Sequence, residues 1–92
     1  MEPNAVEAVL LTMLDLMEEG LSTHGRTTRN LVLQRLHQEW PFDRGEARVA
    51  WRDALDSGLI IEVGRGRRPT LTGEGEGAAI SLRSYVERKA AR

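Results

Sequence analysis

The sequence predicts a small α+β domain in which three helices precede a two-stranded β-hairpin and a fourth helix follows it. Three observations favour this fold class. Apolar residues recur at helical spacing in four segments of the chain. A short run rich in β-branched residues, Leu59 to Val63, lies between two glycines and is typical of a strand. The chain has 92 residues and no cysteine, which suits one small core without disulfides.

The first helix is predicted over residues 4–19. Asn4 and Glu7 have the spacing of a capping box, in which each side chain accepts a hydrogen bond from the other residue's backbone N–H. Leu11 and Leu14 fall outside the main apolar face, so they either widen the core or contact a partner. The expected buried face consists of Val6, Val9, Leu10, Met13, Leu16 and Met17.

The second helix is predicted over residues 28–39, with Thr27 or Thr28 as its N-cap. Arg29 lies in its first turn, where a cation opposes the helix dipole. It is therefore either a phosphate-binding residue, acting with the two threonine hydroxyls and the helix N-terminus, or an ordinary solvated arginine. His37 flanks the buried face and is expected to pack there. The apolar residues of that face are Val32, Leu33, Leu36 and Trp40, whereas Gln34, Arg35 and Gln38 point outward.

The third helix is predicted over residues 44–57, because Pro41 ends the second helix and Asp43 and Glu46 form another capping box. The short break between the two helices is typical of a helix-turn-helix. Ala47, Ala50, Trp51, Ala54 and Leu55 share one face, and Gly45, Arg48, Val49 and Arg52 share the other, with Arg44 projecting past the helix start. Asp53 and Asp56 also point outward, so only the N-terminal half is expected to approach phosphates.

The hairpin is predicted over residues 59–72, with a basic loop from Gly64 to Pro69 that carries three arginines. An extended, exposed Arg-Gly-Arg segment suits the narrow minor groove or the phosphates of DNA. Residues 73–77 are expected to form a turn. The last helix is predicted over residues 76–90, with Ile80 opposite an apolar side made of Ala78, Leu82, Tyr85, Val86 and the stem of Lys89.

The order of elements and two short motifs resemble the winged helix-turn-helix domain of MarR- and PadR-type regulators. Residues 54–60 are similar to that family's recognition helix running into the first wing strand, and residues 68–72, followed by Gly75 and Ala79, are similar to its closing motif. The resemblance implies a three-helix core, a two-stranded β-hairpin wing and an additional C-terminal helix. It places base reading on Arg44, Gly45, Arg48, Val49 and Arg52, minor-groove or phosphate contacts on Arg65, Arg67 and Arg68, and DNA backbone contacts on Thr27, Thr28 and Arg29.

The charge distribution agrees with a nucleic-acid partner better than the net charge of −1 does. Residues 1–19 carry a charge of −5, whereas residues 20–72 carry +3 and residues 73–92 carry +1. We therefore expect sequence-dependent binding of double-stranded DNA by a small transcriptional regulator in the cytoplasm, at the nucleoid. We expect no metal site, because His24 and His37 lie thirteen residues apart without the spacing of metal ligands. We expect no cofactor and no enzymatic activity, because the sequence has no nucleophile–His–acid set and no phosphate-binding loop.

The alternative function is a protein–protein interaction module that works within a larger complex. The near-neutral net charge and the acidic first helix favour it, as do the apolar residues that the predicted faces leave over, which are Leu11, Leu14, Leu31 and Ile80. The sequence also leaves open a homodimer formed through the first and last helices.

Overall fold

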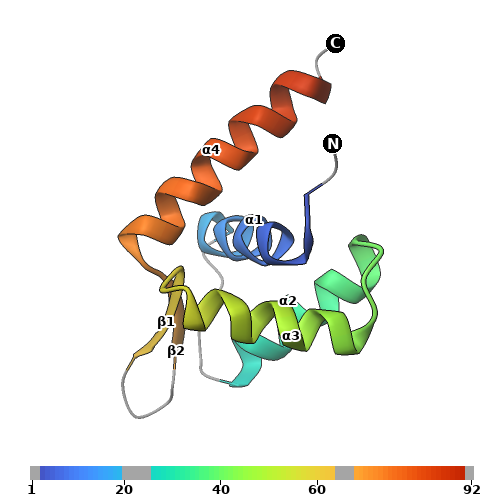
Figure 1. Ribbon diagram of the computed structural model, residues 1–92, viewed down its shortest axis with the longest axis vertical. Helices are drawn as coiled ribbons and strands as arrows, with labels where there is room; N and C mark the ends of the chain where they lie inside the picture. The colour runs from blue at the N-terminus through green and yellow to red at the C-terminus, as the bar shows by residue number, and fades with distance from the viewer. Residues whose placement is uncertain (1–2, 20–25, 64–67, 91–92) are drawn as a thin grey trace.

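The computed structural model describes residues 3–19, 26–63 and 68–90 (Figure 1). It has an α+β fold in which three helices precede a two-stranded antiparallel hairpin and a fourth helix follows it. The elements are α1 (Ala5–Glu18), α2 (Arg26–Glu39), α3 (Arg44–Asp56), β1 (Ile60–Val63), β2 (Arg68–Leu71) and α4 (Gly73–Ala90).

Helix α1 is the centre of the core, with α4 on one side of it and α2 and α3 on the other (Figure 1). Its capping box is present as predicted, since the Asn4 side chain accepts a hydrogen bond of 2.8 Å from the Glu7 N–H. Of the two alternatives for Leu11 and Leu14, the wider core is confirmed, because both are buried where helices pack around α1 on several sides. Met17 was expected in the buried face, but it is 37% exposed.

Helix α2 begins two residues earlier than predicted, so Thr27 and Thr28 lie inside its first turn and do not precede it as caps. Val32 and Leu36 are fully buried, as the apolar spacing indicated. The prediction that His37 packs in the core was wrong, because its side chain is exposed. His37 follows Leu36 by about 100° around the helix, which turns it away from α1 and toward the start of α3.

Helix α3 begins at its predicted capping box, in which the Asp43 side chain accepts a hydrogen bond of 2.8 Å from the Glu46 N–H. Its four fully packed residues are Ala47, Ala50, Trp51 and Ala54. The three alanines let α3 approach both α1 and α2 closely. The sequence predicted this buried face correctly. The opposite side of α3 is exposed to solvent over its whole length.

The hairpin pairs β1 with β2 in an antiparallel register that places Ile60 opposite Leu71 and Glu62 opposite Pro69. Gly58 connects α3 to β1 with a φ of 73°, a conformation that favours glycine. The second strand is longer than predicted, so Arg68 and Pro69 belong to β2 and not to the preceding loop. Pro69 is tolerated there because a two-stranded hairpin has only edge strands.

Helix α4 begins at Gly73, three residues earlier than predicted, so the glycine-rich segment 73–77 is helical and not a turn. The Thr72 hydroxyl accepts a hydrogen bond of 3.0 Å from the Gly75 N–H, as an N-cap does. Ala79 is buried against the core and Leu82 is partly buried, whereas Ile80 is 50% exposed, as predicted. None of the helices in the described residues is long and apolar enough to cross a membrane.

Candidate nucleic-acid interface

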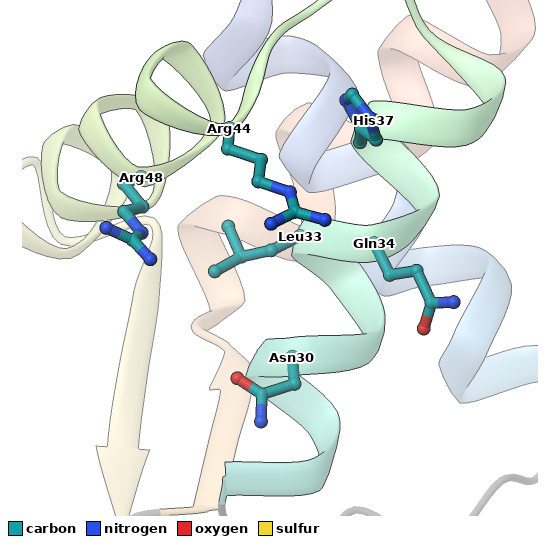
Figure 2. A pocket seen from close by; sticks show the side chains of 6 residues that line it. All are labelled: Asn30, Leu33, Gln34, His37, Arg44 and Arg48. Carbon is teal, nitrogen blue, oxygen red and sulfur yellow. The ribbon is translucent and has the colours of Figure 1, made fainter.

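A groove of about 330 Å³ runs between α2 and the N-terminal half of α3 (Figure 2). Two arginines of α3, one turn apart, form one wall, and the Arg44 side chain points across the groove toward α2. The position of these arginines follows from the Asp43–Glu46 capping box, which fixes where α3 begins. The lining residues are Asn30, Leu33, Gln34 and His37 of α2 and Arg44 and Arg48 of α3.

A second hollow of about 240 Å³ lies where α2, α3 and β1 meet. Leu33 and Arg48 line both this hollow and the groove, so the two depressions adjoin. The other lining residues are Arg29 of α2, Trp51, Arg52 and Leu55 of α3, and Glu62 of β1. The two depressions together form one surface that carries four arginines, Arg29, Arg44, Arg48 and Arg52, which we call the basic face.

The four arginines of the basic face are exposed, and none of them pairs with a carboxylate of a described residue. Their guanidinium groups therefore keep their donors available for an external anion. Glu62 is the one acidic residue among the described residues that line the two depressions. Asp53 and Asp56, which the sequence suggested would repel phosphate, line neither of them.

Two other arginines contrast with this arrangement, because they form ion pairs with carboxylates at the end of α1. Arg35 of α2 donates to Glu19 at 2.9 Å, and this hydrogen bond raises the pKa of Arg35. Arg83 of α4 bridges Glu18 and Asp15 of α1, at 2.7 Å from Asp15, and the hydrogen bond to Glu18 is the main cause of its raised pKa. The acidic end of α1 is thus paired within the fold, whereas the four arginines of the basic face have no such pair among the described residues.

The predicted DNA-binding residues divide into a group that the structure places together and a group that it does not describe. Arg44, Arg48 and Arg52 share one surface with Arg29, and the neighbouring Gly45 is exposed. Val49 lies on the outer side of α3 and is 61% exposed. Arg65 and Arg67 lie outside the described residues, as do the side chains of Arg68, Thr27 and Thr28, although their backbones belong to β2 and α2.

Sequence reasoning missed four residues that line the basic face, which are Asn30, Gln34, His37 and Glu62. The three on α2 follow one another at intervals of four and three residues, the spacing of one helical face. This spacing could have identified the three residues as one polar face of α2. Nothing in the sequence indicates the position of Glu62, because its place in the same hollow as Arg52 depends on how β1 docks against α3.

No protein-family model matches this sequence, and the comparison with curated proteins finds no match. Among solved structures, the chain is similar to the crystal structure of SSV1 F-93, with a TM-score of 0.64 and 22% sequence identity. The match covers 94% of this chain and 90% of that chain. A likeness at this identity concerns the fold alone. The helices and the hairpin are compatible with a winged helix.

Proposed function

We propose that this chain binds double-stranded DNA through the basic face and acts as a small transcriptional regulator, as its resemblance to MarR- and PadR-type regulators implies. The observation that carries the proposal is a set of four exposed arginines on one surface, unpaired with any carboxylate in the described part of the chain. Arginine binds phosphate and the guanine edge with two parallel hydrogen bonds. A surface of this kind suits a duplex that carries both groups.

In the proposed complex the N-terminal half of α3 enters the major groove. Arg44 and Arg48 then approach base edges, and the exposed Val49 side chain is available for a thymine methyl group. Arg29 lies in the first turn of α2, where the helix N-terminus adds its own attraction for a phosphate. The same proposal includes contacts of the hairpin with the minor groove or the phosphates, made by Arg65, Arg67 and Arg68.

The alternative of a protein-interaction module loses much of its support. Of the four apolar residues that favoured it, Leu11 and Leu14 are buried in the core and Leu31 is partly buried against it. Ile80 alone of the four is exposed. A protein partner that binds apolar residues of α1 is therefore disfavoured.

A homodimer through α4 remains a prediction, supported by the exposure of Ile80 on that helix. Replacing Ile80 with glutamate places a charge on that surface. If copies of the chain pair there, I80E should shift the protein from dimer to monomer in sedimentation equilibrium. An unchanged sedimentation profile would exclude this interface.

The proposed function is tested by titrating the protein with mixed-sequence duplex DNA at several salt concentrations. Replacing Arg48 with alanine should weaken binding about tenfold at low salt and reduce the log–log salt slope by about 1, because one positive charge close to the phosphates is lost. The matched control is Arg88→Ala, since Arg88 is exposed on α4. Helix α4 lies on the other side of α1 from α2 and α3, which carry the four arginines (Figure 1).

Two outcomes would contradict the proposal. One is no binding by the unmodified protein at about 10 μM and low salt, a concentration in the range expected even for non-specific binding. The other is an equal effect of R48A and R88A, which would mean that binding depends on overall charge and not on the basic face.

A further inference from the structure

The groove in Figure 2 has a second wall that the proposed function does not use. Asn30, Gln34 and His37 form a polar stripe on α2 that lines the groove together with Arg44 and Arg48. In Figure 2 the Arg44 side chain points toward this part of α2, and the Gln34 amide extends away from both arginines. All three side chains are exposed, and none forms a hydrogen bond with another described residue. The stripe is therefore available for an external partner that occupies the groove.

We infer that α2 is a second base-reading helix, in which Gln34, with Asn30 beside it, contacts base edges next to those contacted by Arg44 and Arg48. This inference rests on the proposed function and deepens it. It assigns to α2 a role in sequence discrimination, in addition to the phosphate contact of Arg29 at its first turn.

The chemistry of the stripe supports base contacts over phosphate contacts. A phosphate oxygen only accepts hydrogen bonds, so it is best bound by arginine or lysine. An amide side chain offers a donor and an acceptor together, and these match the N6 and N7 positions of adenine in the major groove. A wall of amides opposite a wall of arginines therefore suits adenine next to guanine.

The geometry places Gln34 where it can act with the arginines. Gln34 lies between Asn30 and His37 along the stripe, and the Arg44 side chain extends from α3 toward the same part of α2 (Figure 2). The residues come from two helices whose relative position is fixed by packing, since Val32 and Leu36 of α2 and Ala47 of α3 are buried in one core. The two walls are thus held in register with each other.

The test compares two glutamines of α2 that differ in position. Gln34 lines the groove, whereas Gln38 is also exposed but does not line it, so Gln38→Ala is the matched control for Gln34→Ala. A preferred duplex is first selected from a randomised library with the unmodified protein. Binding is then measured for that duplex and for a set in which each base pair is changed in turn.

We expect the unmodified protein and Q38A to discriminate against a changed A·T pair by about 5- to 150-fold, the range of one good bidentate contact. The Q34A variant should bind the original and the changed duplex with nearly equal affinity. The slope of its log affinity against log salt concentration should stay unchanged. Far-ultraviolet circular dichroism would show that both variants remain folded, as expected for exposed positions.

Three results would overturn the inference. Q34A could weaken binding to every duplex equally and lower the salt slope, which would identify a phosphate contact. Q34A could behave as Q38A does, or the unmodified protein could bind without sequence preference. In each case DNA binding itself survives, so these outcomes are distinguishable from failure of the proposed function, in which no duplex is bound.

Discussion

Gly75, in the first turn of α4, packs against the backbone of Leu59 so closely that a Cβ atom at this position would lie 1.8 Å from the Leu59 carbonyl oxygen. The same carbonyl accepts a hydrogen bond of 3.1 Å from the Thr72 N–H. The start of α4 is therefore fixed against the segment that joins α3 to the hairpin. This contact sets the direction in which α4 leaves the hairpin.

We expect Gly75→Ala to destabilise the fold by about 1–3 kcal/mol, because the added methyl group meets backbone that cannot move without shifting the hairpin. Gly77→Ala is the control, since a Cβ atom there has no heavy atom within 4 Å. Its expected effect is a stabilisation of about 0.5–1 kcal/mol from the higher helix propensity of alanine. Urea denaturation followed by circular dichroism measures both, and equal midpoints for the two variants would refute the packing argument.

Thr72 also joins the start of α4 to the segment between α3 and the hairpin. Its hydroxyl donates to the Gly58 carbonyl oxygen at 2.7 Å and accepts from the Gly75 N–H at 3.0 Å. Thr72→Val keeps the shape and removes both bonds, so it should lower the free energy of unfolding by about 1 kcal/mol. Thr70→Val, on β2, should change it by less than about 0.5 kcal/mol. A T72V variant as stable as T70V would show that the hydroxyl does not stabilise the junction.

Glu62 is expected to weaken DNA binding, because it lines the second hollow together with Arg29, Arg48 and Arg52. Glu62→Gln removes one negative charge from the basic face and should strengthen binding about two- to fivefold at low salt, with less effect as salt screens the charges. Glu74→Gln makes the same charge change on α4 and serves as the control. A gain of the same size in E74Q would assign the effect to net charge alone.

Arg83 bridges Asp15 and Glu18, but these two carboxylates are more than half exposed. We therefore expect Arg83→Ala to cost less than about 1 kcal/mol of stability, as is usual for exposed ion pairs. A double-mutant cycle with Asp15→Ala, measured at low and high salt, gives the pair's own contribution. A loss several times larger would mean that the docking of α4 on α1 depends on these charges more than on the burial of Ala79.

The sequence alone determined the local features of this protein. Both capping boxes, the start of α3, the buried face of α3 and the antiparallel hairpin follow from interactions between residues close together in the chain. For the same reason Arg44, Arg48 and Arg52 could be placed on the exposed side of α3 before any packing was known.

Only the tertiary structure decided the features that depend on which elements meet. Leu11 and Leu14 became core residues because helices surround α1, and α4 can begin close against Leu59 because Gly75 has no Cβ atom. Packing of α2 on α3 placed Gln34 and Arg44 in the lining of one groove, and docking of β1 placed Glu62 in a hollow with three arginines. These relationships join residues distant in the chain. Helical periodicity gives the side of each helix that is apolar, but it does not give the neighbour that each polar side meets.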